Sequence, residues 1–232
     1  MYFQHAREIW DDFPELVPGV LAVDGVTSHV AVEDRISRFN AIANARLATS
    51  TEGELAEIQA WRRAFSKMGL KPTQYRCASE ALLRRYRKEG SLPQIHPLID
   101  VCNAVSLAFA IPVAVFDVSK VAERLEVRYA RGDETYVNFS GDVESPEPHE
   151  VIFADAAGQA HARRWTNRQS AESAVRASTA SALVVAEALH GSAPADVQRL
   201  VADLGDELRG VGFVILRTAI LSRRSPAFEL LA

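Results

Sequence analysis

Residues 92–117 read LPQIHPLIDVCNAVSLAFAIPVAVFD, and nearly every position from 97 to 110 is apolar. A helix with this composition is buried on most of its faces, because it has no continuous polar side to turn toward water. Pro112 cannot continue a helix, and the four apolar residues after it have the length of a short buried strand. The stretch therefore predicts a buried helix that leads directly into a strand of the core.

Three polar side chains interrupt this apolar helix at regular spacing. His96, Asp100 and Asn103 stand at i, i+4 and i+7, and Ser106 extends the same stripe. A buried carboxylate is costly unless it is paired or hydrogen-bonded. We expect Asp100 and Asn103 to be largely buried and to line or brace a cavity. The alternative is local: His96 and Asp100 cap the helix or tie down a loop, because buried polar groups are normally satisfied nearby.

The composition is that of a soluble globular protein. The chain has 232 residues, of which 48% are hydrophobic and 24% charged. Two cysteines, Cys77 and Cys102, are too few for a disulfide scaffold and fit a reducing compartment, so we expect a cytoplasmic protein. The longest apolar run, residues 101–118, is broken by Pro112 and Asp117, and the charged N-terminus lacks the apolar segment of a signal peptide. We therefore expect no membrane partner.

The charge of the chain limits the way in which it could bind nucleic acid. Its formal net charge is −4, which argues against indiscriminate coating of nucleic acid, because such binding requires a broad basic surface. Docking of one RNA through a local patch is compatible with this charge. Two basic patches are present, at residues 84–88 (RRYRK) and 163–168 (RRWTNR). The first has the pattern of a solvated helix face.

The patch at 163–168 combines arginine forks, an amide and an aromatic ring. This set of groups suits recognition of a carboxylate, a phosphate or a nucleotide. A solvated strand end is the alternative. The candidate binding residues on this basis are Arg163, Arg164, Asn167, Arg168 and Thr179.

The rest of the chain predicts helices first and paired strands later. After a strand at 16–26, helices are expected at 33–48, 52–67, 76–89 and 96–110, the second with Thr51 and Glu54 at capping-box spacing. The second half predicts strand pairs at 125–130 with 135–139 and 151–154 with 161–165, a strand or buried helix at 181–189, a helix at 194–209 and a strand at 211–220.

This order of elements predicts an α+β fold with a mixed, largely antiparallel sheet core and flanking helices. No linker is long enough to separate domains, so residues 1–232 are expected to form a single domain in which residues 125–190 supply most of the sheet. No nucleophile elbow, phosphate loop or zinc-protease motif is present, and the six histidines are scattered. We therefore expect no metal site and no cofactor.

Several short motifs follow one another between positions 93 and 141. They are Ile99-Asp100, Asn103-Ala104-Val105-Ser106-Leu107, Pro112, Phe116-Asp117 and Lys120, followed by Val127-Arg128-Tyr129-Ala130, Gly132-Asp133-Glu134 and Phe139-Ser140-Gly141. In this order they resemble the tRNA-editing domain of the phenylalanyl-tRNA synthetase β-subunit, with its segments N-x-V-V-D-x-x-N-Y-V-M-L-E-x-G-Q-P-x-H-A-F-D-x-x-K, V-R-x-A-x-x-G-E and L-D-G. The resemblance covers about half of the chain, residues 69–189.

The resemblance implies an editing-domain-like core at residues 69–189, with a strand and helices before it in 1–68 and a helix and a strand after it in 190–232. No synthetase catalytic core, anticodon module or ATP-binding motif accompanies the core, as expected of a free-standing relative. The family's domain hydrolyses tyrosine wrongly esterified to tRNA(Phe). By resemblance, this chain is expected to hydrolyse misacylated aminoacyl-tRNA carrying an aromatic amino acid, in trans, with the aminoacylated end of tRNA as its partner.

One position departs from the family pattern. The histidine of P-x-H-A-F-D corresponds to Ala114, and His96 is the nearest replacement. The candidate catalytic residues are therefore His96, Asp100 and Asn103, which would orient or deprotonate water. An aminoacyl ester is activated, so a positioned water and an oxyanion site could suffice. Three functions stay open: a deacylase, a non-catalytic module that binds tRNA or an amino acid, and a hydrolase of another small ester or amide.

Overall fold

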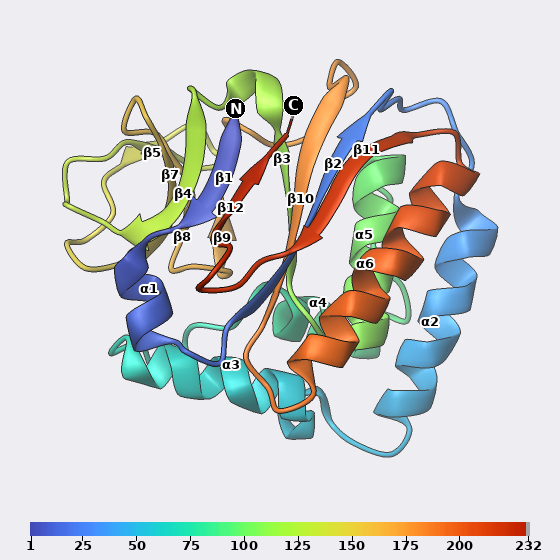
Figure 1. Ribbon diagram of the computed structural model, residues 1–232. Coiled ribbons are helices and arrows are strands. Elements are labelled where there is room, and N and C mark those ends of the chain that lie inside the picture. Colours follow the sequence, from blue (N-terminus) through green and yellow to red (C-terminus); the bar gives the residue numbers. More distant parts are fainter. Residues whose placement is uncertain (231–232) are drawn as a thin grey trace.

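The computed structural model, which describes residues 1–230, contains two main sheets that share one apolar core, and a small two-stranded sheet (Figure 1). The smaller sheet has four antiparallel strands in the order β11 (Val214–Ile220), β2 (Val17–Asp24), β10 (Ser181–Ala188) and β3 (Val113–Asp117). Residues 182–188 are buried, as expected for a strand that is covered on both faces. The segment at 181–189, which suited a strand or a helix, is therefore a strand.

Three helices cover one face of the four-stranded sheet (Figure 1). They are α2 (Glu33–Leu47), α5 (Pro97–Phe109) and α6 (Ala193–Gly210). Successive strand residues point to opposite faces, so Val115 and Val184 pack with these helices, whereas Phe116 and Val185 pack toward the other sheet. The four-stranded sheet therefore separates a helical side of the molecule from an inter-sheet side.

The packing of α6 on β2 depends on a glycine. A Cβ atom at Gly19 would lie 2.5 Å from a methyl group of Val201 and 2.6 Å from one of Val197, both on α6. Real Cβ atoms do not approach other atoms so closely, so only glycine allows the helix to lie at this distance from the strand.

The larger sheet has six strands and draws on both ends of the chain. Its order is β12 (Ala227–Glu229), β1 (Tyr2–His5), β4 (Arg124–Tyr129), β7 (Val151–Asp155), β8 (Ala160–Arg163) and β9 (Arg168–Gln169). Only β1 and β4 run parallel; the other neighbours are antiparallel. The short helix α1 (Arg7–Asp12) follows β1. The sequence patterns did not predict β1, α1 or β12.

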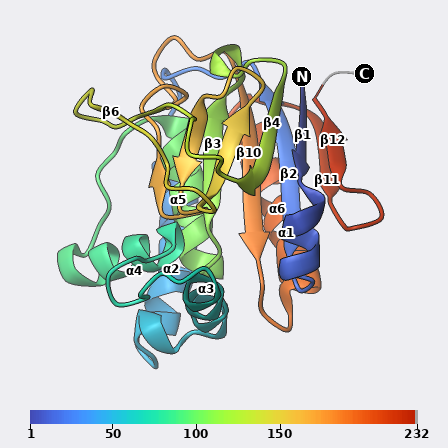
Figure 2. The ribbon, with the colours of Figure 1, turned by 90° about the vertical axis from the view of Figure 1, so that its left-hand side faces the viewer.

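Two further helices, α3 (Ala56–Lys67) and α4 (Ala78–Glu89), lie at the same end of the molecule in both views (Figures 1 and 2). Thr51 and Glu54 form the predicted capping box. It caps a separate 3₁₀ turn, η1 (Glu52–Glu54), and α3 begins only after Leu55. The helix predicted at 52–67 is thus divided in two. A second 3₁₀ turn, η2 (Val118–Lys120), follows β3.

The α+β class with a mixed, largely antiparallel sheet core and flanking helices is confirmed, but one predicted strand pair is wrong and the predicted source of the sheet holds for the larger sheet alone. The segments 125–130 and 135–139 do not form a hairpin: β4 pairs with β1 and β7, and β5 (Tyr136–Val137) pairs with β6 (Val143–Glu144). The carboxylate of Glu134 accepts hydrogen bonds from the backbone N–H groups of Arg131 and Gly132, which holds this turn as a loop. Residues 125–190 supply β4, β7, β8 and β9 of the larger sheet, as expected, but only β10 of the four-stranded sheet, because β2, β3 and β11 lie outside them.

Within residues 1–230, no helix combines the length and the apolar character that crossing a membrane requires.

Candidate functional site

A small cavity lies between the two sheets, and we call it the inter-sheet cavity. Its volume is about 70 Å³. Ala114 and Phe116 of β3 line it together with Val185 and Glu187 of β10, and the segment 162–169 closes it from the larger sheet. Ala114 pairs with Val185 in the antiparallel register of the two strands. Since Glu187 follows two residues later, its side chain points to the same face.

Glu187 places a carboxylate in this otherwise apolar region. Its oxygen Oε1 lies 2.7 Å from Nε2 of His5 and accepts a hydrogen bond of 2.9 Å from Nε1 of Trp165. Both of these contacts are made by Oε1, and within residues 1–230 no hydrogen bond reaches the other oxygen, Oε2. Two donors on one oxygen fix the orientation of the carboxylate, and the other oxygen remains available to a ligand in the cavity.

The indole of Trp165 is held firmly in place. Its ring makes edge-to-face contacts with Phe13 and Trp61, at centroid distances of 4.8 and 5.0 Å. Arg164 and Trp165 both have a left-handed backbone, with φ of 47° and 56°. Such a conformation costs a non-glycine residue about 1–3 kcal/mol, and residues strained in this way cluster at functional sites. The strained turn directs the Trp165 side chain into the core, where it meets Glu187.

Polar side chains lie at the edge of the inter-sheet cavity. Asn167 donates a hydrogen bond of 2.8 Å to the backbone carbonyl of Arg76, just before α4. Arg168 is 38% exposed, lies over the ring of Tyr136 and pairs with Glu144 at 3.3 Å. Asn167 and Arg168 are the two predicted binding residues that the structure brings to the cavity.

The structure places two other predicted binding residues away from the cavity surface. The guanidinium of Arg163 is 4% exposed and pairs with Glu144 at 2.6 Å and with Glu150 at 2.9 Å. Its N–H donors are therefore occupied by these two carboxylates of the protein itself. Thr179 is buried and donates a hydrogen bond of 2.7 Å to Asp117, at the far end of β3. Neither side chain lines the inter-sheet cavity.

Arg164 neither lines the inter-sheet cavity nor is fully buried. Its backbone N–H donates a hydrogen bond of 2.9 Å to Glu150, and its guanidinium lies over the ring of Tyr75 at 4.8 Å from the ring centroid. The side chain is half-buried and forms no ion pair within residues 1–230.

The predicted catalytic stripe lies at a second cavity on the helical side, which we call the helix-face cavity. It has a volume of about 210 Å³ and lies between α2, α5 and the loop at 91–94. Asp100 and Asn103 line it, as predicted, but they are half-buried and not largely buried. The four-stranded sheet separates this cavity from the inter-sheet cavity. The predicted active site, which combined the stripe with the arginines of 163–168, is therefore not one site.

Two polar groups of the stripe form hydrogen bonds with the start of their own helix, whereas Nε2 of His96 is buried and has no partner within residues 1–230. Nδ1 of His96 accepts a hydrogen bond of 3.2 Å from the backbone N–H of Leu98, and Asp100 accepts one of 2.9 Å from Ile95. Burial raises the pKa of Asp100 against these hydrogen bonds, and burial lowers the pKa of His96 despite the nearby Asp100. This is the local arrangement that the sequence allowed as an alternative.

His5, Glu187 and Trp165 were not predicted as a group. They come from three distant parts of the chain, and no spacing rule connects them. One signal was present in the sequence: Glu187 is the only charged residue in the apolar run SALVVAEAL at 181–189. A carboxylate in a strand buried on both faces requires partners or a ligand.

Comparisons with known proteins agree with this fold. A family model described as the B3/4 domain matches residues 60–202. The phenylalanine–tRNA ligase β-subunit of Coxiella burnetii is 43% identical over 53 residues, which are 23% of this chain and 7% of that protein. The corresponding subunit of Thiobacillus denitrificans is 29% identical over 126 residues, which are 54% of this chain and 16% of that protein.

A solved structure has a similar fold. The N-terminal fragment of the phenylalanyl-tRNA synthetase β-subunit from Pyrococcus horikoshii superposes with a TM-score of 0.50 at 10% identity, over 92% of this chain and 49% of that one. This chain thus spans about half of the solved fragment, and its matches cover less than a fifth of the two β-subunits.

Proposed function

The chain belongs to the B3/4 domain family, and on this premise we propose that it binds the aminoacyl end of a tRNA at the inter-sheet cavity and hydrolyses the ester of a misacylated amino acid in trans. The observation that carries the proposal is the Glu187 carboxylate. It lies in a cavity whose wall includes Ala114, the position at which the editing-domain signature has its histidine. The resemblance to that domain and the relation to synthetase β-subunits both support a tRNA substrate.

Glu187 is the group that we assign to the chemistry. A water molecule near Oε2 transfers a proton to the carboxylate as its oxygen attacks the ester carbonyl. The protonated carboxyl then returns this proton to the ribose oxygen as the ester C–O bond breaks, which releases the amino acid and the tRNA hydroxyl. His5 and Trp165 hold Oε1 and keep the carboxylate oriented. This assignment replaces the one that the sequence favoured, because Asp100 and Asn103 line the helix-face cavity beyond the sheet, and His96 lines neither cavity.

The volume of the inter-sheet cavity limits the size of the amino-acid side chain that it can hold. A volume of about 70 Å³ is roughly half that of an engineered apolar cavity of about 150 Å³ that binds benzene. As it stands, the cavity holds a side chain of a few heavy atoms. An aromatic side chain, which the resemblance implies, requires Arg168 and Gln169 at the edge to move outward.

The test is a deacylation assay with tRNAs charged with alanine, serine, phenylalanine or tyrosine. We expect loss of at least one ester, and a rate about 100 to 10,000 times lower in Glu187→Gln, as is typical when a general base is removed. Asp100→Asn, in the helix-face cavity, is the matched control and should keep the wild-type rate. Hydrolysis that Glu187→Gln leaves unchanged in a folded protein would place the chemistry elsewhere.

A second function, binding without hydrolysis, is favoured by Ala114. A module that lacks the family's histidine could retain the pocket and recognise an aminoacylated tRNA or an amino acid. In this case the wild type would bind charged tRNA but release no amino acid from any member of the panel. The two functions are distinguished by one measurement of binding and one of ester loss on the same sample.

The arginines near the cavity should contribute to tRNA affinity. Arg164→Glu with Arg168→Glu should weaken binding and reduce its dependence on salt concentration, because fewer phosphate contacts release fewer counterions. Arg224→Glu, at an exposed turn far along the chain, is the control for net charge. Arg163 is omitted, since a charge reversal there would leave Glu144 and Glu150 without their buried partner. Equal affinity in the double variant and the control would remove these arginines from the tRNA contact.

A further inference from the structure

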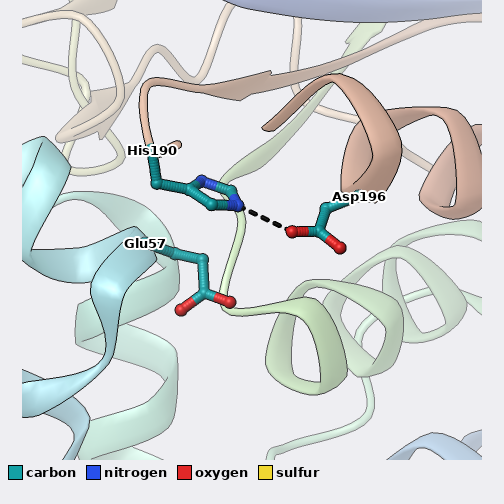
Figure 3. Close-up of side chains that lie close together, drawn as sticks. All are labelled: Glu57, His190 and Asp196. Carbon is teal, nitrogen blue, oxygen red and sulfur yellow. Dashed lines mark hydrogen bonds and ion pairs between the residues drawn. The ribbon is translucent and has the colours of Figure 1, made fainter. Parts of the chain in front are cut away.

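Three side chains with metal-binding atoms meet at the junction of α3, β10 and α6. Glu57 belongs to α3, His190 follows the end of β10, and Asp196 lies in the first turn of α6. One potential ligand atom from each of the three lies within 4.8 Å of the others. Figure 3 shows the imidazole ring of His190 with the two carboxylates grouped around it.

The contacts of the cluster leave one oxygen without a partner. Nε2 of His190 lies 2.9 Å from Oδ2 of Asp196 (Figure 3), and Arg46 donates a hydrogen bond of 2.7 Å to Oε1 of Glu57. The other oxygen of Glu57, Oε2, is buried and has no hydrogen-bond partner in the range 1–230. A buried carboxylate oxygen without a donor is costly, and such a group in a native structure is often explained by an ion or a water molecule.

The histidine adds a second unusual feature. Its side chain is 3% exposed, and its other ring nitrogen, Nδ1, also has no partner among the described residues. No contact on Nδ1 therefore fixes the proton on Nε2. The ring can carry its proton on Nδ1 and present Nε2 as a lone pair toward the two carboxylates.

We propose that Glu57, His190 and Asp196 bind a divalent transition-metal ion such as zinc. One imidazole nitrogen and two carboxylate oxygens form a three-ligand set that leaves a fourth position open, as in many zinc sites. The imidazole favours zinc and its neighbours over magnesium or calcium, which prefer oxygen ligands alone. Nε2 would bind the ion in place of its present hydrogen bond to Asp196.

Two arginines bear on the affinity of this site. Arg46 contacts Glu57 and Arg199 contacts Asp196, so each carboxylate already has one positive partner. Arg199 is 70% exposed and can move into solvent, whereas Arg46 is 28% exposed and also donates a hydrogen bond of 2.9 Å to the carbonyl of Ala108. Each arginine bonds one oxygen of its carboxylate. This leaves Oε2 of Glu57 for the ion, whereas Oδ2 of Asp196 also accepts a hydrogen bond of 2.6 Å from the hydroxyl of Ser192 and would bind the ion beside that contact.

A metal ion at this place would connect α3 to the end of β10. His190 stands three residues after Glu187, and Trp61 of α3 donates a hydrogen bond of 3.3 Å to the Glu187 carbonyl. The ion would therefore fix the strand end that carries the carboxylate of the inter-sheet cavity. The site itself does not depend on the proposed hydrolysis, because none of its three residues lines that cavity.

The test is a titration of chelator-treated protein with zinc chloride, followed by calorimetry. We expect one ion per chain, with binding at least ten times weaker in Glu57→Gln and in Asp196→Asn. Both changes keep the size of the side chain, and circular dichroism verifies the fold of each variant. His29→Ala, which removes an exposed histidine outside the cluster, is the matched control and should bind as the wild type does.

Cobalt provides a second readout that does not depend on a variant. Co²⁺ bound with four ligands absorbs visible light intensely, and zinc should displace it at one equivalent. In zinc-soaked crystals of the wild type, an anomalous peak should lie about 2.0–2.2 Å from an atom of each of the three residues. Absence of zinc binding by the wild type, binding that Glu57→Gln and Asp196→Asn leave unchanged, or a peak at other residues would overturn the proposal.

Discussion

The two cavities lie on opposite faces of the four-stranded sheet, and their polar groups are held in different ways. In the inter-sheet cavity, Glu187 is held by His5 and Trp165, which are remote from it in sequence. At the helix-face cavity, Asp100 accepts a hydrogen bond from the backbone of Ile95, five residues away, and the nearby His96 accepts one from the backbone of Leu98. The difference shows that polar residues at helical spacing can simply complete the start of their own helix, whereas a carboxylate held by distant donors requires the whole fold.

The two cavities also differ in what their polar groups can do for a ligand. The half-buried groups beside α5 already face water, so a ligand there replaces solvent contacts of similar strength. The carboxylate of Glu187 lies among aromatic rings, where an electrostatic contact with a ligand is stronger because less water screens it. This contrast is the physical basis for the proposal that a ligand binds in the inter-sheet cavity, and variants on the two sides of the four-stranded sheet test it.

The largest expected effect on stability is at Trp165, whose indole lines the inter-sheet cavity. Trp165→Ala should lower the free energy of unfolding by about 3–5 kcal/mol, because it removes a fully buried ring and one donor to Glu187. The matched change beside the helix-face cavity is Ile95→Ala, at a residue 64% exposed, which should cost less than about 0.5 kcal/mol. Urea denaturation measures both. Similar losses in the two variants would contradict the contrast between the two sides.

The next largest effect on stability is expected at His5 of β1, which bonds to the Glu187 carboxylate. His5→Phe keeps a buried ring of similar shape but leaves Glu187 with Trp165 as its donor, so we expect a loss of about 1–3 kcal/mol. The double variant His5→Phe with Glu187→Gln should recover part of this loss, because an amide is less costly than a carboxylate in the same place. Additive losses in the double variant would show that the two side chains do not act together.

The dependence of stability on pH distinguishes Asp155, whose pKa is lowered, from Asp100, whose pKa is raised. Burial alone would raise the pKa of Asp155, but hydrogen bonds from His161 and from backbone N–H groups hold it at about 2. Asp155 therefore stabilises the fold above its ordinary pKa, and this contribution, about 1–2 kcal/mol, is lost as the pH falls toward 2. Asp100 has a raised pKa, so its charged form costs stability that returns as the pH falls through that raised value.

The corresponding variants are Asp155→Asn and Asp100→Asn, with unfolding measured between pH 7 and pH 2. Asp155→Asn should be destabilised at pH 7 and lose less stability on acidification than the wild type. Asp100→Asn should be no less stable at pH 7. A wild-type acid profile in Asp155→Asn would show that another carboxylate causes the loss.

The smallest expected effect on stability is at Asp100, which lines the helix-face cavity. Asp100→Ala leaves the backbone N–H of Ile95 without its acceptor at an exposed place, where water can replace it. We expect a loss of about 1 kcal/mol, at the low end of the cost of an unsatisfied polar group. A thermal melt is sufficient, and a loss above about 3 kcal/mol would show that Asp100 does more than complete the start of α5.

Much of the fold was predictable because its signals are local. Helices α2, α4, α5 and α6 and strands β2, β3, β4, β7, β8 and β11 lie close to the predicted ranges, since hydrophobic period, caps and turn residues act within a few positions. Strands β1 and β12 escaped prediction. Each is only three or four residues long and depends on partners distant in sequence: β12 pairs with β1, and β1 pairs with both β12 and β4.

The candidate site was less predictable than the fold. The spacing of Asp100 and Asn103 correctly indicated a cavity, and the apolar run around Glu187 contained a charge that needed partners. The group of Glu57, His190 and Asp196 had no signal at all, because a long stretch of chain separates its first member from the other two. Such groups become neighbours only when strands and helices pack.

The sequence by itself determined the α+β class, the buried helix that leads into β3, the family resemblance and the departure at Ala114, because each depends on residues near one another in the chain. Only the tertiary structure decided which polar groups share a cavity. Arg163 and Asp100 looked equally available in the sequence, yet one pairs with two glutamates inside the protein and the other completes a helix start. The reason is physical: the partners of a polar side chain are set by the elements that pack around it, and that packing depends on the whole chain.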